Sequence, residues 1–199
     1  EVRNGGLILH TADGGSTWTS QVTGTGNRLR SVYFADAQTG WAAGKYGTVL
    51  KTSNGGNTWI SQASGSNSHL SSVYFQDINT GWAAGHLGTI LYTTDGGNSW
   101  LTQVSGTSLD LLGICFISNT TGWAVGQSGT ILKTTDSGYN WITQVTGTTR
   151  NLYAVYFISN LTGWTVGYDI ANNNSVILKT TNGGSSWAFK AIIRRPSGV

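Results

Sequence analysis

Charged residues are scarce in this sequence. Only 10 % of the 199 residues are charged, with 11 Lys and Arg against 8 Asp and Glu, and the formal net charge is +3. No run of cations is longer than Arg194-Arg195. A protein that follows a nucleic-acid backbone needs clustered cations, so we expect no nucleic-acid partner.

Cysteine, proline and methionine are also almost missing, with one Cys, one Pro and no Met. The single Cys115 excludes an internal disulfide and a cysteine-based metal cluster.

No segment approaches the ~18–20 apolar residues of a membrane-spanning helix, so we expect no membrane insertion. Because the first five residues do not form a signal peptide, we expect that a leader was removed or that residues precede Glu1. No phosphate-binding Gly loop or Gly-x-Ser-x-Gly elbow is present, and we expect no cofactor.

Glycine and tryptophan, by contrast, are abundant, at 29 and 9 residues. Many glycines without a collagen period indicate many tight turns. The Val, Ile, Thr, Tyr and Trp residues suit a half-buried pleated surface. The composition therefore predicts an all-β protein.

An internal repeat of 41 residues organises the chain, and its clearest markers are two columns of tryptophan. The first column comprises Trp41, Trp82, Trp123 and Trp164, and the second comprises Trp18, Trp59, Trp100, Trp141 and Trp187. Trp187 follows after 46 residues instead of 41, because five extra residues lie within 169–174. A period near 41 is typical of one four-stranded blade of a β-propeller.

Within one period we predict strand A at 31–34, strand B at 40–44, strand C at 48–52 and strand D from Trp59 onward. The chain then holds four and a half blades: a half-blade at 1–22, full blades at 28–64, 69–105, 110–146 and 151–191, and a tail or linker at 192–199. An open propeller exposes sheet edges that natural folds avoid. We therefore expect the chain to be part of a ring of about six or seven blades, with the remainder upstream.

Five copies of a turn motif lie between strands C and D, such as TTDGGNSW at 93–100. Asp or Asn can accept hydrogen bonds from the backbone amides that follow it, and Gly supplies positive φ. The motif resembles the Asp box, or bacterial neuraminidase repeat, and we assign it a structural role. Its acidic or amide residues are Asp13, Asn54, Asp95, Asp136 and Asn182.

The combined pattern VYF-x-D-x-x-TGW-A-x-G-x-x-GT-I-L-K-T-T-D-G-G-x-x-W is more specific. It resembles the photosystem II assembly and stability factor family and related repeats of secreted bacterial proteins. This resemblance implies a propeller, seven-bladed in that family, that binds a protein partner. It also implies an extracytoplasmic location, whether secreted, periplasmic or at the cell surface.

Catalytic and metal-binding residues are not supported by the sequence. Only Asp110 and Asp169 among the carboxylates break the repeat, whereas a glycosidase needs two carboxylates held across one bond. The arginine cluster and the Tyr with a supporting Glu that sialidases require have no counterpart, since the sole Glu is Glu1. His10, His69 and His86 lie in loops or columns that do not supply three converging ligands. We expect no enzyme activity and no metal.

One face of the repeat varies between copies. The D–A and B–C loops differ from blade to blade, while the A–B loops and the C–D turns hardly change. Arg, Tyr and Asn are suited to recognition, so we predict binding through Arg28, Arg30, Lys45, Tyr46, His69, His86, Gln127, Arg150, Asn151, Tyr153, Tyr168 and Asn172. The resemblance implies that Arg28, Arg30 and Arg150 form the basic surface that engages a client protein. Neutral drift in exposed loops is the alternative.

Three functions therefore remain open. The first is a non-catalytic binding or assembly propeller that contacts a protein through the variable face. The second is a carbohydrate-binding module that holds a glycan. The third is a fragment of a glycoside hydrolase or sialidase-like enzyme whose catalytic residues lie outside this chain.

Overall fold

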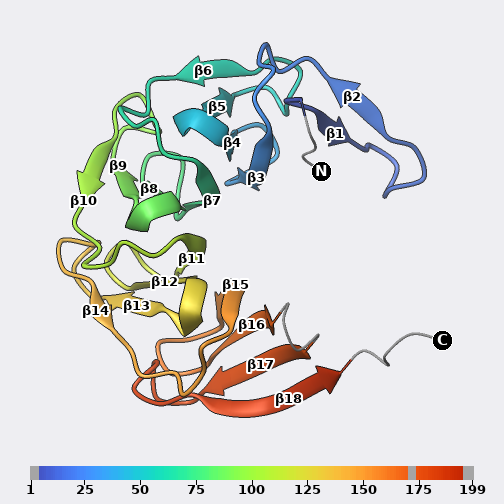
Figure 1. Cartoon of the computed structure of the whole chain (residues 1–199). Coiled ribbons are helices and arrows are strands. Elements are labelled where there is room, and N and C mark those ends of the chain that lie inside the picture. Colours follow the sequence, from blue (N-terminus) through green and yellow to red (C-terminus); the bar gives the residue numbers. More distant parts are fainter. Residues whose placement is uncertain (1–4, 170–173, 195–199) are drawn as a thin grey trace.

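In a computed structural model, which describes residues 5–169 and 174–194, the chain forms an open arc of antiparallel β-sheets (Figure 1). Four sheets have four strands and one has two. Within each four-stranded sheet the strands lie in sequence order, with strand A lining the inside of the arc and strand D its rim. The predicted all-β propeller architecture of four and a half blades is confirmed.

The strands repeat in length as well as in order. The half-blade comprises β1 (Ile8–His10) and β2 (Thr19–Gln21). Blade 1 comprises β3 (Leu29–Phe34), β4 (Gly40–Gly44), β5 (Val49–Thr52) and β6 (Ile60–Gln62). Blade 2 comprises β7 (Leu70–Phe75), β8 (Gly81–Gly85), β9 (Ile90–Thr93) and β10 (Leu101–Gln103). Blade 3 comprises β11 (Leu111–Phe116), β12 (Gly122–Gly126), β13 (Ile131–Thr134) and β14 (Ile142–Thr143). Blade 4 comprises β15 (Asn151–Phe157), β16 (Gly163–Asp169), β17 (Asn174–Thr180) and β18 (Ala188–Arg194).

Strand D begins one residue later than predicted, at Ile60 rather than Trp59, because the ladder with β5 ends at the pair Lys51–Ile60. At the other end of the chain, the predicted tail at 192–199 overlaps β18, which continues to Arg194. The extra residues of blade 4 lengthen β17, and its first residue, Asn174, pairs with Arg194. Of the predicted tail, 195–199 lies outside the described residues.

The B–C connections are short 3-10 turns in three blades: η1 (Lys45–Gly47), η2 (His86–Gly88) and η3 (Gln127–Gly129). In blade 4 the corresponding hairpin is longer, since β16 and β17 have seven residues each and pair as far as Asp169 and Asn174. The described part of the blade 4 hairpin thus ends at Asp169 and Asn174, at the B–C end of the blade that η1, η2 and η3 occupy in the other blades.

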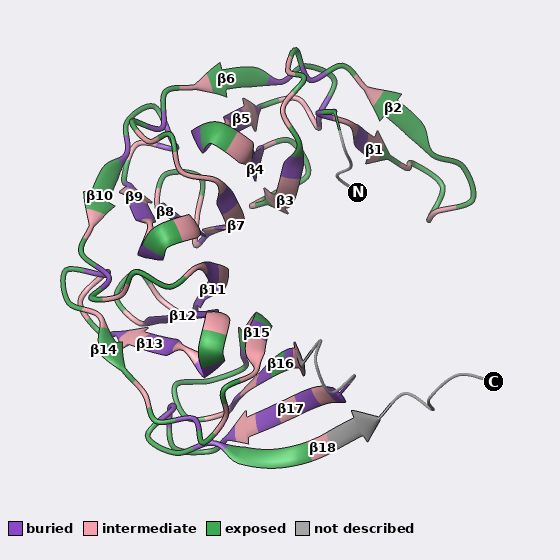
Figure 2. Ribbon diagram, viewed as in Figure 1, coloured by how far each residue is buried: buried purple, intermediate pink, exposed green. Residues whose placement is uncertain are grey.

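The buried residues of each blade lie in the central strands, whereas strand D is exposed (Figure 2). All five residues of β4, β8 and β12 are buried. Their small residues are required by the packing, because a Cβ on Gly81 would lie 2.5 Å from the ring of Phe75. This contact explains why Gly precedes the strand-B tryptophan in each blade.

Neighbouring blades are joined by stacked aromatic rings. The strand-B tryptophan of one blade lies flat on the strand-A phenylalanine of the next, with ring centroids 3.5 Å apart at Trp41–Phe75, Trp82–Phe116 and Trp123–Phe157. The phenylalanine then meets the edge of its own blade's strand-D tryptophan, as in Phe116–Trp141 at 6.0 Å. The Trp82 indole N–H also donates to the backbone oxygen of Ser137 in the next blade, at 3.0 Å. Each junction thus combines burial, stacking and a hydrogen bond.

At the two ends of the arc, the equivalent apolar residues are exposed. Phe34 is 40 % exposed whereas Phe75 is fully buried. Val166 of blade 4 is 43 % exposed, although the matching Ala43, Ala84 and Val125 have no exposure. These residues have the chemistry of a blade junction, but within the described residues Phe34 has only the two-stranded half-blade on its open side and Val166 has no further sheet.

The five C–D turns share one hydrogen-bond pattern. In the turn at 93–100, Asp95 Oδ1 accepts from the Ser99 backbone N–H at 2.9 Å, and Thr93 Oγ1 accepts from the Gly97 N–H at 3.0 Å. Asp13 and Asp136 make the same bonds to Thr17 and Asn140. Where Asn replaces Asp, its Oδ1 accepts from the same amide, as in Asn54 with Thr58 and Asn182 with Ser186. These side chains hold the turn closed.

We predict that Phe116→Ala lowers the free energy of unfolding by about 3–5 kcal/mol, because it removes the ring between Trp82 and Trp141. Urea unfolding followed by circular dichroism measures this loss. Phe34→Ala is the matched control, and its loss should be less than half as large because Phe34 is 40 % exposed and, among the described residues, has no strand-B tryptophan stacked on it. Equal losses would contradict the role of the stack.

We further predict that Asp95→Ala lowers the melting temperature by about 2–4 °C, whereas Asp95→Asn lowers it by less than half as much. Asn already makes these bonds at Asn54 and Asn182.

The hydrogen bonds from Ser99 hold the pKa of Asp95 at about 2, below its usual 3.8. This stabilisation is present above pH 3.8 and is lost as the pH falls toward 2. Thermal unfolding between pH 2 and 7 should show a weaker acid response in Asp95→Asn, and an unchanged response would contradict the prediction.

Candidate functional site

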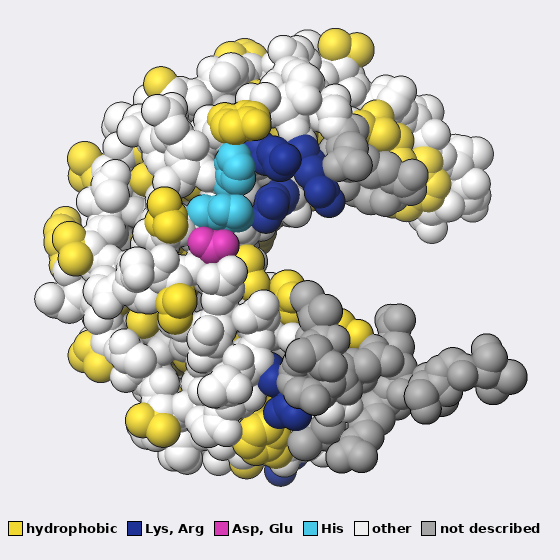
Figure 3. All heavy atoms as spheres, in the orientation of Figure 1, with side chains coloured by type: hydrophobic (Ala, Val, Ile, Leu, Met, Phe, Trp, Pro, Cys, Tyr) yellow, Lys and Arg dark blue, Asp and Glu magenta, His cyan; other side chains and the backbone are white. Residues whose placement is uncertain are grey.

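The predicted binding residues lie mainly on one face of the arc, which we call the loop face. It carries η1, η2, η3 and the segments that lead into β3, β7, β11 and β15. Lys, Arg, His and Asp side chains gather on this face at the inner edge of the arc (Figure 3). The C–D turns lie at the opposite end of the blades, so the two predicted sets of residues are separated by the fold.

Each inner strand has a β-bulge at its loop-face end. The register of the A–B ladder shifts between Leu29 and Ser31, and at the equivalent place in the other three blades. The bulged residues are Arg30, Ser71, Leu112 and Tyr153. A bulge re-aims a side chain, and together with Arg28 and Leu29 these four line a hollow of about 360 Å³ inside the arc.

This hollow brings together the predicted residues Arg28, Arg30 and Tyr153. Ser71 and Leu112 also line it and were missed by the sequence analysis, although both share the repeat column of Arg30. Alignment of that column was the available signal. Ser and Leu side chains do not by themselves indicate a binding site, so the sequence gave no reason to choose this column; the β-bulge is what places them in the hollow.

A second column of the loop face forms hydrogen bonds between blades. The side chains of His69, Asp110 and Asn151 accept from backbone N–H groups 23 residues earlier, in the B–C turn of the preceding blade, at 3.0, 3.0 and 3.1 Å. The three donors are Tyr46, Leu87 and Ser128, which have φ of 57°, 54° and 53°. Such a backbone is uncommon outside Gly, and the acceptor stabilises it.

This column therefore has a structural role, which the sequence did not reveal. An imidazole nitrogen, a carboxylate and an amide oxygen can all accept the same hydrogen bond. The variation among His69, Asp110 and Asn151 is thus an exchange of equivalent acceptors. For His69 and Asn151, the two members of this column that were predicted as binding residues, the geometry supports the drift alternative.

Arg28 occupies the same column in blade 1 but cannot play the same part. The equivalent turn residue is Gly5, with φ of 79°. A guanidinium group has only donors, so Arg28 cannot accept from the Gly5 N–H. Among the described residues its side chain forms no hydrogen bond or ion pair. Arg28 thus differs from the acceptors at this position of the other blades, and no contact within its own blade explains the arginine.

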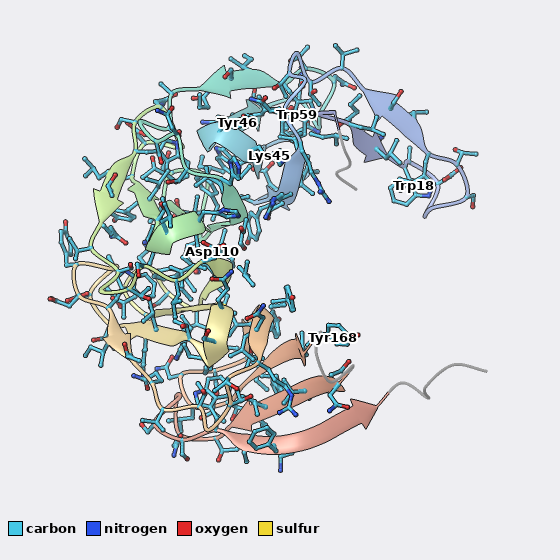
Figure 4. The ribbon with its side chains drawn as sticks, in the orientation of Figure 1. Trp18, Lys45, Tyr46, Trp59, Asp110 and Tyr168 are labelled. Carbon is cyan, nitrogen blue, oxygen red and sulfur yellow. The ribbon has the colours of Figure 1, made fainter. Side chains whose placement is uncertain are left out.

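Arg30 and Lys45 lie beside Arg28 and add to a positive surface. The Arg30 guanidinium approaches His86 Nε2 at 3.5 Å, and its Nε is buried without a hydrogen-bond partner. Lys45 lies on η1, where the exposed Tyr46 follows it (Figure 4). In the described part of the chain, neither cation forms an ion pair with a carboxylate.

The nearby carboxylate, Asp110, is already engaged. It accepts from the Leu87 N–H, and its Oδ2 lies 3.2 Å from Gln127 Nε2 and 3.8 Å from His86 Nδ1. Gln127 Oε1 in turn accepts from the Asp110 N–H at 3.3 Å. Asp110, His86 and Gln127 therefore form a network across blades 2 and 3, and Arg28, Arg30 and Lys45 keep a net positive charge.

The remaining predicted residues belong to blade 4 and do not line this hollow. Arg150 precedes β15, and its backbone N–H donates to Thr148 Oγ1 at 3.2 Å. Tyr168 lies near the end of β16 and pairs with Asn151 and Ser175 (Figure 4). Asn172 lies outside the described residues. The predicted trio of arginines is thus divided between blade 1 and blade 4.

Groups that could support other chemistry are dispersed or buried. Within 5–169 and 174–194, no three His, Cys, Asp or Glu side chains come close enough to hold a metal ion. Cys115 is buried between blades, and burial raises the pKa of its thiol to about 12. No helix of the described residues has the length and apolar content to cross a membrane.

Comparisons with solved structures show the fold. YCF48 bound to a D1 peptide is 20 % identical with a TM-score of 0.56, over 82 % of this chain and 80 % of that one. YCF48 from Cyanidioschyzon merolae is 24 % identical with a TM-score of 0.67, over 86 % and 58 %. A GH74 enzyme from Niastella koreensis is 19 % identical with a TM-score of 0.71, over 92 % and 34 %. The chain therefore spans only part of each of these proteins.

No curated protein sequence matches the chain. The model of the photosynthesis system II assembly factor YCF48 family matches residues 20–109 and again 101–195. These two matches cover most of the 41-residue repeats, including the β-bulges and the strand-B tryptophans described above. The chain belongs to the photosynthesis system II assembly factor YCF48 family.

Proposed function

We propose that the chain is a non-catalytic protein-binding module that holds an extended, acidic segment of a partner on the loop face. The segment lies over the hollow formed by the bulged residues, with Arg28, Arg30 and Lys45 as its main contacts. The observation that carries this proposal is Arg28. It stands in a column where the other blades place a structural acceptor, and its guanidinium remains available for a partner.

The chemistry of the surface supports an acidic segment. Arg presents several donors in a planar fork that matches a carboxylate. Asp110, a carboxylate on the same face, is held by Leu87 and Gln127, and no ion pair joins it to Arg28. Leu112 and Tyr153 add apolar contact to the hollow. A peptide that combines acidic and apolar side chains fits this mixture.

The comparisons support a peptide as the ligand, because one YCF48 structure is bound to a D1 peptide. The GH74 enzymes share the fold at 12–22 % identity, which carries no activity to this chain. Of the two carboxylates that break the repeat, Asp110 stabilises the η2 turn. We therefore favour binding over hydrolysis, with glycan binding as an outcome of the test below.

We also propose that further blades complete the ring and that the protein acts outside the cytoplasm. The exposed Phe34 and Val166 support the first point, since their counterparts are buried by neighbouring blades. The resemblance to repeats of secreted bacterial proteins supports the second. Fractionation of the source cells with an antibody against the chain tests the location, and recovery in the cytoplasm alone would contradict it.

We predict that Arg28→Ala, Arg30→Ala and Lys45→Ala together weaken binding of an acidic peptide at least tenfold, or about 1.4 kcal/mol. The D1 peptide is the first probe, and fluorescence anisotropy of the labelled peptide measures Kd. The melting temperature should change little, because these side chains carry no junction contact comparable to Trp82 or Phe116. Binding of wild-type protein should also weaken with salt.

Lys190→Ala is the matched control, because Lys190 is an exposed cation on the rim strand β18. It should leave Kd unchanged. Equal loss in both variants would indicate non-specific charge attraction and contradict the proposed site. Binding of neutral xyloglucan oligosaccharides in preference to every acidic peptide, or their hydrolysis, would contradict the proposed function.

A further inference from the structure

We infer that His69 makes the junction between blades 1 and 2 sensitive to protons: when its imidazole binds a proton, the Tyr46 N–H of the η1 turn loses its acceptor on blade 2. This inference concerns the fold and is independent of the proposed function. It rests on the acceptor column of the loop face. At the three junctions where that bond forms, the acceptors are His69, Asp110 and Asn151.

His is the acceptor whose ordinary pKa lies near neutrality. His69 Nδ1 accepts from the Tyr46 N–H at 3.0 Å. A neutral imidazole can do so with its proton on Nε2, whereas the imidazolium has donors on both nitrogens and no acceptor. Protonation of Nδ1 therefore places its N–H opposite the Tyr46 N–H, so the hydrogen bond is lost. The Asn151 amide carries no proton that titrates and cannot undergo this change.

The surroundings of His69 favour its neutral form. Its ring packs edge-on against Tyr46 and against His86 of η2, each at 4.9 Å between centroids. Lys45 of η1 and Arg30 of β3 add positive charge nearby. Asp110, which precedes β11, acts in the opposite direction and raises the pKa of His69, but its carboxylate lies against His86, with Oδ2 3.8 Å from His86 Nδ1. Desolvation first, and then repulsion from His86, Lys45 and Arg30, lower the pKa of His69 below 6.5.

The direction of the pH effect follows from this lowering. The unfolded chain binds a proton at His69 near pH 6.5, while the folded chain binds it only at lower pH. Between these two values the unfolded state carries more protons, so stability rises with pH. The contribution of His69 is complete above pH 6.5 and is lost as the pH falls toward the folded pKa.

The expected response is local. The Gly47 N–H donates to the Ser68 backbone oxygen at 2.8 Å, and the Trp41–Phe75 stack holds the interior of the same junction. Neither contact titrates in this range. Loss of the His69 bond therefore loosens Tyr46, whose φ of 57° depends on that acceptor, while the blades stay together.

Amide hydrogen exchange tests this inference within one protein. The Ser128 N–H, held by Asn151, is the internal control for the Tyr46 N–H, held by His69. Between pH 7.5 and pH 5, we expect the protection factor of Tyr46 to fall at least tenfold relative to that of Ser128. Equal change at both amides would overturn the inference, whether or not any variant folds.

His69→Asn is the matched variant, because Asn fills this position in blade 4. Its Tyr46 protection factor and its urea midpoint should depend less on pH between 5 and 6.5 than those of wild type. His86→Asn keeps His69 as the acceptor, so the loss of Tyr46 protection at low pH should persist in that variant, at a somewhat higher pH because the repulsion from His86 is removed. A response that persists in His69→Asn, or that disappears only in His86→Asn, would overturn the assignment to His69.

Discussion

The stack between the strand-B tryptophan of one blade and the strand-A phenylalanine of the next is the contact on which the other features depend. It requires Gly before the tryptophan, because a Cβ there would enter the ring of the blade's own phenylalanine. It also fixes how closely successive inner strands approach one another. The bulged residues Arg30, Ser71, Leu112 and Tyr153 can line one hollow only because four such strands are held side by side.

The loop face shows that variation between repeats has two different causes. In the column of His69, Asp110 and Asn151, three unlike side chains perform one task, and the chemistry that they share is a lone pair directed at a backbone N–H. Arg28 stands in that column without a lone pair to offer. A residue that cannot perform the structural task of its repeat position, such as Arg28, therefore indicates function better than variability does. Variable residues that all perform the task, such as His69, Asp110 and Asn151, are only replacements of one acceptor by another.

Charge on this face is arranged by the same contacts. Asp110 is drawn into the junction between blades 2 and 3, which leaves the cations of blade 1 without a carboxylate among the described residues. His69 lies between these two regions, in contact with Tyr46 and His86. The hydrogen bonds that hold the blades together thus also decide where positive charge remains and which side chain responds to protons.

The sequence by itself determined the blade, its period and the part of each residue in the C–D turns, because these depend on contacts within about 41 residues that recur in every copy. It also separated the loop face from the opposite face. Only the tertiary structure decided which loop-face residues work between blades and which line the hollow. Partners 23 residues apart in different blades, and bulges that turn Ser71 and Leu112 inward, leave no mark in composition or alternation. Their positions follow from the angle at which one blade packs on the next.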